Sequence, residues 1–443
     1  SQRENTMSTY VLGACPIWGH VSPVIAVGQH LRAAGHSVTM LTGSRFREQV
    51  EAAGLTHVAL PADADFDDRQ PDSYMPDRER YRGIARVRYE IETVFVRRTA
   101  GQYRGMRALI DQLHPDAVLV DSVYSGALPL LLGPAESRPP IVALGIAPLG
   151  QRSVDTAPYG FALPPARSAA VNRLRNRALR ALVEKVLFRP TQVLANKILA
   201  ELGLPASPRF VMDMSAMFDR FFQLSIPAFE YPRSDLAPNT SFVGPLLPKL
   251  PQGSALPEWW GDLAAGRPVI HVTQGTLDNQ DFGRLIRPAI DGLADLDALV
   301  VVSTGGRPVV ELGDLPANVR AAEFLPYADL LPRVSAMVTN GGYGGVQLAL
   351  ASGIPLVVAG STEDKPEVAA RVAYTGTGVN LRTGTPSPAA VRGAVEKVLG
   401  DPSFAARARE LAAQFARHDA FAAVEQELAA LGQPKGAAPL VTA

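Results

Sequence analysis

The stretch Tyr-Val-Leu-Gly-Ala-Cys-Pro-Ile-Trp-Gly-His-Val-Ser-Pro occupies residues 10–23. Its apolar first part, residues 10–17, predicts a buried β-strand. Ser22 and Pro23 are residue types preferred at the N-cap and the first position of a helix. Apolar residues from Val24 to Leu31 then recur at helical spacing. A buried strand that leads directly into a helix is the repeating unit of a doubly wound α/β domain.

The same alternation of strand and helix continues along the chain, with one interruption. Further buried strands are expected over residues 37–41, 117–120, 141–145, 269–273, 298–303, 336–339 and 355–359. Continuous apolar strands separated by helices indicate parallel sheets that are covered on both faces. Residues 233–257 are rich in proline and polar side chains and predict a linker. Residues 404–431 predict one long helix.

We therefore expect an α/β protein with two doubly wound, Rossmann-like domains that face each other across a cleft. The expected divisions are a first domain over residues 7–232, a linker over 233–257, a second domain over 258–415, and a C-terminal helix and tail over 416–443. We expect Met7 to be the natural start of the chain.

Composition excludes several classes of protein. The 443 residues contain 43 Lys plus Arg and 43 Asp plus Glu, and a formal charge of zero argues against nucleic acid as the main partner. The single cysteine, Cys15, excludes a disulfide framework and a cysteine zinc cluster. No apolar run has membrane-spanning length, and the first residues do not resemble a signal peptide. A cytoplasmic protein is expected.

Two polar residues follow strands that belong to the same predicted sheet. His20 comes after the first strand, and Asp121 ends the apolar run at 117–120. Ligands bind at the carboxyl ends of the strands in such sheets. A histidine oriented by a carboxylate can deprotonate a hydroxyl near neutral pH. The alternatives are a helix-start histidine without chemistry for His20 and a helix cap for Asp121.

Residues 340–345, Asn-Gly-Gly-Tyr-Gly-Gly, follow a strand and open a helix. Their backbone N–H groups and the helix dipole suit a diphosphate. The spacing differs from the dinucleotide and P-loop motifs, and a tight turn without a ligand is the alternative. Residues 273–276, Thr-Gln-Gly-Thr, end another strand and can hold further phosphate oxygens, or form an ordinary turn. Phe324 can stack on a base, with core packing as its alternative.

An acidic run with D-x-D spacing raises the question of a metal. It consists of Asp63, Asp65, Asp67 and Asp68. Because the run follows a proline among polar residues, we favour a solvated loop near the acceptor side over a metal site.

Together these motifs resemble the GT-B glycosyltransferases of the plant and bacterial natural-product type, over residues 10–431. Residues 19–23, Gly-His-Val-Ser-Pro, are similar to the family's G-H-x-x-P start, whose histidine is the catalytic base. Asp121 stands where the family keeps the aspartate paired to that base. The resemblance thus implies His20 and Asp121 as the catalytic pair.

Three segments in the second half carry the rest of the resemblance. Residues 324–327 are similar to an aromatic-x-Pro-Gln segment whose aromatic ring stacks on uracil. Residues 340–345 with Gln347 are similar to a His-x-Gly motif that holds the diphosphate. Residues 363–365, Glu-Asp-Lys, match an Asp-Gln pair that binds sugar hydroxyls. The implied donor-binding residues are Thr273, Gly275, Thr276, Phe324, Tyr327, Asn340, Gly342, Gly344, Gly345, Gln347, Glu363, Asp364 and Lys365.

The chain departs from the family pattern at four positions. Asn340 replaces the phosphate-binding histidine, and Tyr327 replaces the glutamine of the base-binding segment. Leu348 stands where a glutamate normally holds the ribose hydroxyls, so UDP and dTDP both stay open. Lys365 replaces a glutamine, whereas Asp364 is retained and favours a hexose.

The resemblance implies an inverting, metal-independent hexosyltransferase. UDP-glucose is the favoured donor, dTDP-glucose is possible, and no other cofactor is implied. The acceptor is expected to be a small apolar natural product, such as a macrolide, an ansamycin or a phenolic polyketide. Its pocket is expected between residues 66–89 and 145–161, with contacts from Trp18, Phe66, Tyr124 and Ile146. A nucleotide-sugar epimerase of the same fold and a catalytically silent binding protein remain the alternatives.

Overall fold

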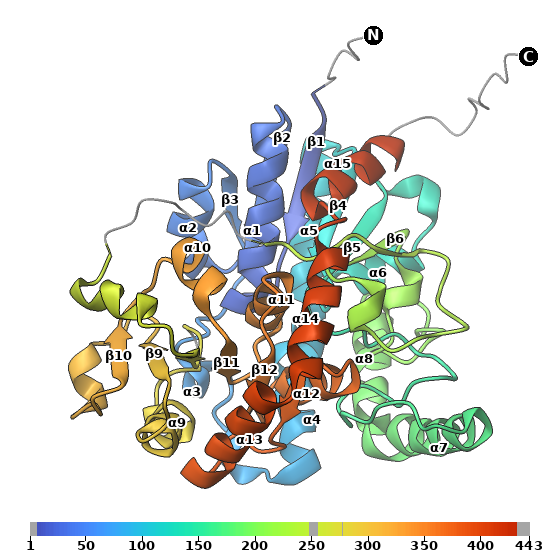
Figure 1. Cartoon of the computed structure of the whole chain (residues 1–443). Coiled ribbons are helices and arrows are strands. Elements are labelled where there is room, and N and C mark those ends of the chain that lie inside the picture. Colours follow the sequence, from blue (N-terminus) through green and yellow to red (C-terminus); the bar gives the residue numbers. More distant parts are fainter. Residues whose placement is uncertain (1–6, 248–255, 277, 432–443) are drawn as a thin grey trace, which may run out of the picture.

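The computed structural model describes residues 7–247, 256–276 and 278–431, and it contains two parallel β-sheets (Figure 1). The first sheet has seven strands in the order β3-β2-β1-β4-β5-β6-β7. These strands are β1 (Thr9–Gly13), β2 (Ser37–Thr42), β3 (Thr56–Ala59), β4 (Ala117–Asp121), β5 (Ile141–Gly145), β6 (Arg220–Gln223) and β7 (Thr240–Phe242). We call the part of the chain built on this sheet the first domain.

The second sheet has six strands in the order β10-β9-β8-β11-β12-β13. These strands are β8 (Val269–Thr273), β9 (Leu299–Ser303), β10 (Val319–Ala322), β11 (Ala336–Thr339), β12 (Leu356–Val358) and β13 (Gly378–Asn380). The part built on it is called the second domain. Paired strands run parallel in both sheets, so the prediction of two doubly wound domains is confirmed.

Helices cover both faces of each sheet. In the first domain they are α1 (Trp18–Ala33), α2 (Arg47–Ala52), α3 (Pro71–Tyr74), α4 (Gly83–Val94), α5 (Thr99–Leu113), α6 (Ala127–Leu132), α7 (Ala169–Leu182) and α8 (Arg189–Glu201). In the second half of the chain they are α9 (Ile286–Leu293), α10 (Tyr327–Leu330), α11 (Tyr343–Ala351), α12 (Lys365–Tyr374), α13 (Pro388–Gly400), α14 (Pro402–Phe415) and α15 (Ala420–Leu431). Alternate residues of β1 illustrate the layering, because Val11 and Leu12 belong to separate buried cores.

The start of α1 differs from the prediction. The helix begins at Trp18, so Ser22 lies inside it and is not its N-cap. A side chain from another part of the chain supplies the cap, since the backbone N–H of Trp18 donates to Asp68 Oδ2 at 2.9 Å. As a result, His20 lies in the first turn of α1, at the carboxyl edge of the sheet.

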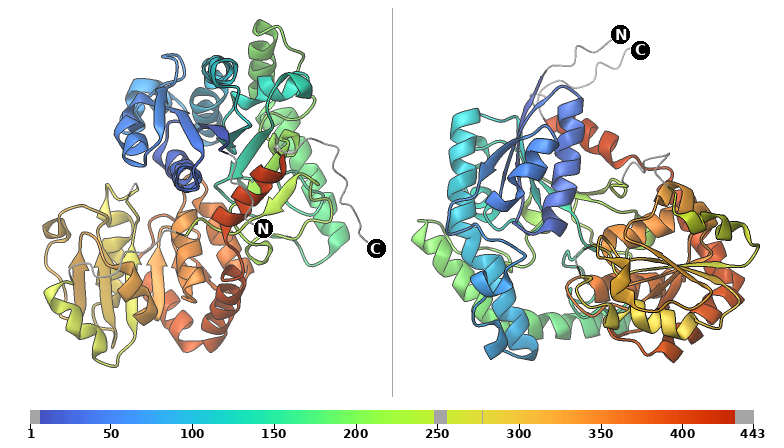
Figure 2. Two further views of the ribbon diagram at one scale, coloured as in Figure 1. Left: turned by 90° about the horizontal axis from the view of Figure 1, so that it is seen from above. Right: turned by 90° about the vertical axis from the view of Figure 1, so that its left-hand side faces the viewer.

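The predicted helix over residues 404–431 is also interrupted. The chain forms α14, breaks at residues 416–419 and continues as α15. α15 returns to the first domain (Figure 2). Its residues Ala420, Val424 and Leu428 are buried in the same core as Val24 and Leu31 of α1. The C-terminal segment therefore connects the two domains by apolar packing. The predicted tail from residue 433, and the part of the predicted linker over 248–255, lie outside the described residues.

Candidate active site

The strand order of each sheet reverses at one point. In the first sheet this point lies between β1 and β4, and in the second it lies between β8 and β11. Loops leave a doubly wound sheet in opposite directions at such a point, and the crevice there binds ligands. His20 follows β1 and Asp121 is the last residue of β4, whereas residues 275–276 and 340–345 follow β8 and β11. The fold therefore places the predicted acid–base pair and the predicted phosphate turns at the two crevices.

The structure brings His20 and Asp121 together. Nδ1 of His20 lies 3.2 Å from Oδ1 of Asp121, whose side chain is fully buried. The backbone N–H of Val123 donates to the same oxygen at 2.9 Å, and the N–H of Cys15 donates to Oδ2 at 2.7 Å. These two hydrogen bonds fix the orientation of the carboxylate beside the imidazole. In the tautomer that carries its proton on Nδ1, His20 donates a hydrogen bond to the carboxylate, and Nε2 keeps a lone pair.

The pKa of His20 reflects opposing influences. Burial lowers it, but the charge of Asp121 and the hydrogen bond to it, together with the charges of Asp364 and Glu363, raise it above its ordinary value. The His20 side chain keeps 21% of its surface exposed, so a substrate can reach it. Asp364 and Glu363 belong to the second domain, so charges from both domains act on His20.

An apolar cluster lies beside the acid–base pair. It contains the buried residues Cys15, Phe66, Met75 and Val94, with Ile17, Tyr74, Tyr89 and Phe95 packed against them. The ring of Phe95 is 5.9 Å from the imidazole of His20. Sequence reasoning missed Phe95, because it directly follows α4 without any motif around it.

The predicted acceptor residues occupy different environments. Phe66 belongs to the apolar cluster and stacks on Tyr74 at 4.3 Å between ring centroids. Trp18 stacks on Phe46 at 6.1 Å, and Ile146 is half-buried at the end of β5. Tyr124, by contrast, lies in the core and not on a pocket wall. Its ring is fully buried, and its hydroxyl donates to the carbonyl of Gln102 at 3.1 Å.

The carboxylates of the acidic run form ion pairs with arginines or accept hydrogen bonds from backbone N–H groups. Asp67 and Asp68 both pair with Arg45, at 3.1 and 3.0 Å, and Asp63 pairs with Arg104 at 2.6 Å. Asp65 accepts from the N–H of Ser44 at 3.2 Å. Within the described residues, no group of three or more His, Cys, Asp or Glu is arranged to hold a metal ion.

The glycine-rich turn presents an open helix start. Gly341 has φ +88°, which favours glycine, and it directs the chain from β11 into α11. Gly344 and Gly345 are exposed, and a Cβ built on either would meet none of the described atoms within 4 Å. Their N–H groups belong to the first helical turn, which has no internal acceptors for them. The turn can therefore accommodate an anion.

Two residues next to this turn are already engaged. Asn340 donates its side-chain amide to the carbonyl of Gln274 at 2.7 Å and thereby links the two turns that were predicted to bind phosphate. Gln347 is buried and donates to the carbonyl of Leu224 in the first domain at 3.1 Å. In this conformation both side chains brace the site instead of facing the crevice.

The turn after β8 is formed similarly. Gly275 has φ +73°, and its N–H donates to Oγ1 of Thr273 at 3.1 Å. Thr276 is exposed beyond it. Thr273 therefore shapes the turn, while Gly275 and Thr276 are accessible to a ligand.

The two aromatic rings of the predicted base-binding segment differ in their exposure. Phe324 is 68% exposed and lies beside Gly306, where a Cβ would come within 2.8 Å of the ring. The hydroxyl of Tyr327 instead lies 2.9 Å from Nε2 of His271, a buried histidine whose pKa burial lowers to about 4. Only Phe324 offers a free ring face.

Several charged side chains lie close together at the start of α12. Nζ of Lys365 lies 3.4 Å from Asp278 Oδ2 and also contacts Glu363, which has φ +55°. Asp364 is adjacent. Burial raises its pKa, as does Glu363, while Lys365 and His20 lower it. Asp278, which sequence reasoning missed, thus belongs to the same charged group.

Two family models match separate parts of the chain. The N-terminal domain of glycosyltransferase family 28 matches residues 18–119, and the C-terminal domain of erythromycin biosynthesis protein CIII-like proteins matches residues 287–431. Among solved structures, the calicheamicin glycosyltransferase CalG4 covers 98% of this chain and 100% of its own, with a TM-score of 0.72 and 22% identity. VinC, solved with dTDP, has a TM-score of 0.64 and 21% identity over 96% of this chain and 99% of its own. These likenesses show the GT-B fold.

Curated relatives are similar over nearly the whole length. The 4'-demethylrebeccamycin synthase of Lentzea aerocolonigenes is 39% identical over 91% of this chain and 94% of its own. UDP-glycosyltransferase 2 of Phaeomoniella chlamydospora is 36% identical over 94% of both chains. The chain thus belongs to the family of UDP-glycosyltransferases and bacterial natural-product glycosyltransferases, and it is a glycosyltransferase of the GT-B fold.

Proposed function

We propose that the chain transfers a hexose, glucose by preference, from a nucleoside diphosphate sugar to a hydroxyl of a small apolar natural product. One observation carries the proposal: Nδ1 of His20 lies 3.2 Å from Asp121 at the point where the strand order of the first sheet reverses. The charge of Asp364, from the second domain, also acts on His20. A donor sugar bound between the two domains would have the proposed base, His20, on one side. On the other side it would have Asp364, whose carboxylate can accept hydrogen bonds from the sugar hydroxyls. The apolar cluster around Phe66 and Phe95 supports an apolar acceptor next to the base.

In the proposed reaction, Nε2 of His20 takes the proton of the acceptor hydroxyl. The hydroxyl oxygen attacks the anomeric carbon as the bond from that carbon to the diphosphate breaks, so the configuration inverts. The electron pair leaves with the nucleoside diphosphate, and the proton stays on His20. Asp121 stabilises the resulting imidazolium, as expected of a buried carboxylate bonded to Nδ1.

The proposal assigns the diphosphate charge to N–H groups of Gly344 and Gly345 and to Thr276, assisted by the α11 dipole. It needs no metal, and the arginine pairs of Asp63, Asp67 and Asp68 support this assignment. Phe324 is proposed to stack on the base. Asp364 is proposed to accept hydrogen bonds from the sugar hydroxyls, next to Glu363 and Lys365.

A turnover assay tests the proposal. The protein is incubated with UDP-glucose and a panel of phenols, macrolides and ansamycins, and products are identified by mass spectrometry and by the anomeric coupling constant. We expect a β-glucoside from α-linked UDP-glucose, with UDP released only when an acceptor is present. Conversion of the nucleotide sugar without an acceptor would indicate an epimerase, and binding without turnover would indicate a silent protein.

A further inference from the structure

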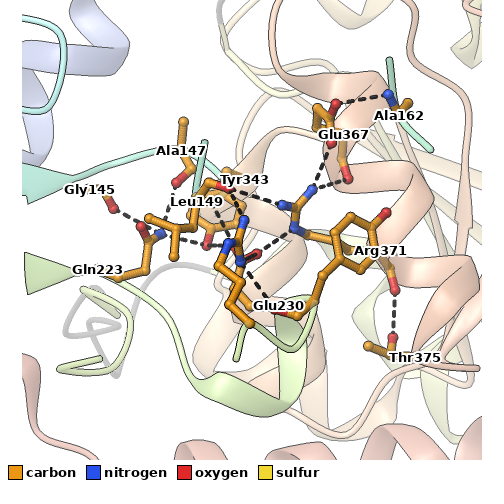
Figure 3. A network of polar contacts seen from close by, with 12 residues as sticks. Gly145, Ala147, Leu149, Ala162, Gln223, Glu230, Tyr343, Glu367, Arg371 and Thr375 are labelled. Atoms are coloured by element: carbon orange, nitrogen blue, oxygen red, sulfur yellow. Dashed lines mark hydrogen bonds and ion pairs between the residues drawn. The ribbon is translucent and has the colours of Figure 1, made fainter. Parts of the chain in front are cut away.

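The loop after β5 is attached to the second domain. We call residues 146–162 the post-β5 loop, and it includes most of one proposed wall of the acceptor pocket. The backbone N–H groups of Gly160 and Ala162 both donate to Oε1 of Glu367, each at 2.8 Å. Glu367 lies in the first turn of α12 and is buried (Figure 3). One carboxylate oxygen of the second domain thus binds the C-terminal end of a loop that belongs to the first domain.

The loop backbone depends on this contact. Ala162 has φ +51° and Gly160 has φ +97°. The left-handed region is disfavoured for any residue with a Cβ, so alanine does not adopt it by local preference. Two charge-assisted hydrogen bonds to Glu367 offset that cost.

A buried charge cluster fixes the Glu367 side chain. One turn further along α12, Nη1 of Arg371 donates to Glu367 Oε2 at 2.9 Å, and Nε donates to Glu230 Oε2 at 2.8 Å. The other oxygen of Glu230 accepts from the N–H of Leu149 at 2.8 Å (Figure 3). Both ends of the post-β5 loop are therefore tied to the same ion-pair cluster. A buried ion persists only when its partners hold it, so this cluster specifies one position for the loop.

The same helix begins with the proposed sugar-binding residues. Glu367 is three positions after Asp364, which is less than one helical turn. Tyr159 of the loop lines a small pocket together with Glu367. Burial, then the charges of Asp364 and Glu367, raise the pKa of the Tyr159 hydroxyl well above its ordinary value. The same pocket, between the loop and α12, is lined by Gly150, Thr156 and Tyr159 on one side and by Glu367 and Arg371 on the other.

We propose that Glu367 is a positioning residue for the acceptor: it holds the post-β5 loop against the helix that carries the donor-sugar residues. The inference rests on the proposed function, because it concerns the acceptor pocket of that reaction. The acceptor wall is then complete only when α12 is in place, and acceptor binding depends on a residue that touches neither substrate.

The test compares Glu367→Ala and Glu367→Gln with the wild type. Glu396→Ala is the control, because Glu396 forms an ion pair of similar length, 2.9 Å to Arg392, on the surface of α13. We expect Glu367→Ala to raise the acceptor KM about 10–100-fold, as for loss of a charged hydrogen bond, and to leave the donor KM within about twofold. Glu367→Gln should be intermediate, since its amide oxygen still accepts both N–H groups.

Hydrogen exchange of residues 157–163 provides a readout that needs no turnover. Their amides should exchange faster in Glu367→Ala than in the wild type or Glu396→Ala. If the wild type glycosylates nothing, the proposed function fails, while the exchange experiment still decides whether Glu367 holds the loop. If Glu367→Ala does not fold because Arg371 loses one of its two carboxylate partners, the double variant Glu367→Ala/Arg371→Met removes both charges together and leaves Glu230 paired with Arg233. Equal rises in donor and acceptor KM, an unchanged acceptor KM, or unchanged exchange would each overturn the proposal.

Discussion

Nδ1 of His20 lies 3.2 Å from Oδ1 of Asp121, although 101 residues separate the two in the chain. Parallel pairing of β1 with β4 creates this proximity, because Gly13 and Val120 are partners in the register. The loop that follows β1 then leads into α1 next to the last residue of β4. The pair is therefore a product of the sheet order, and its chemistry can be tested one residue at a time.

Replacing the proposed base should separate catalysis from donor binding. We expect His20→Ala to lower kcat for alcohol acceptors by about 10²–10⁴-fold, the usual contribution of a general base. Donor affinity, measured by calorimetry with UDP, should stay nearly unchanged because His20 lies on α1, away from the phosphate turns. A collapse of UDP affinity would instead make His20 a binding residue.

Asp121→Asn should change the pH profile. The catalytic imidazole must be neutral, and Asp121 raises the pKa of His20, so wild-type kcat/KM should rise with pH up to a pKa above 6.5. Removing the negative charge lowers that pKa, and the acidic limb should move to lower pH. The loss at the optimum should be milder than for His20→Ala. An acidic limb that does not move in the variant would show that another group controls it.

Chelation of metals should leave activity intact. The proposed mechanism stabilises the diphosphate with N–H groups at the start of α11, and Arg45 and Arg104 neutralise the acidic run. We expect the same initial rate with UDP-glucose before and after treatment with EDTA. A complete loss that magnesium or manganese restores would assign Asp63, Asp65, Asp67 and Asp68 a catalytic role.

The enzyme should discriminate poorly between UDP-glucose and dTDP-glucose as donors. Leu348 cannot accept a hydrogen bond from a ribose hydroxyl, so UDP-glucose and dTDP-glucose should give similar kcat/KM values. Leu348→Glu should shift the ratio toward UDP-glucose by about 1 kcal/mol, the net value of one added hydrogen bond. If the wild type already prefers UDP-glucose by about a thousandfold, as a site that binds a hydroxyl can, then another residue contacts the ribose.

Local sequence patterns predicted most of the central strands of both sheets, because a strand that is buried along its whole length consists of a continuous run of apolar residues. Residues 141–145, 269–273 and 336–339 are strands with the predicted bounds, and all of them are buried. Arg220–Gln223 and Thr240–Phe242 escaped prediction because such short strands carry too few apolar residues to stand out. The glycines of residues 340–345 marked the turn at α11 because positive φ and open space favour that residue type.

By itself, the sequence determined the two doubly wound sheets, the strand ends that carry His20 and Asp121, and the glycine turn before α11. Each of these follows from the residue types within a few positions of one another. Only the tertiary structure decided that Asp68 caps α1, that Asn340 bonds to Gln274, and that α15 returns to the first domain. It also decided that Glu367 holds Gly160, 207 residues away. The physical reason is the range of the interactions, because dihedral preference and periodicity act only between neighbours in the chain. The contacts of Asp68 and Asn340 form when distant segments of one domain come together, and those of α15 and Glu367 form only when the two domains pack.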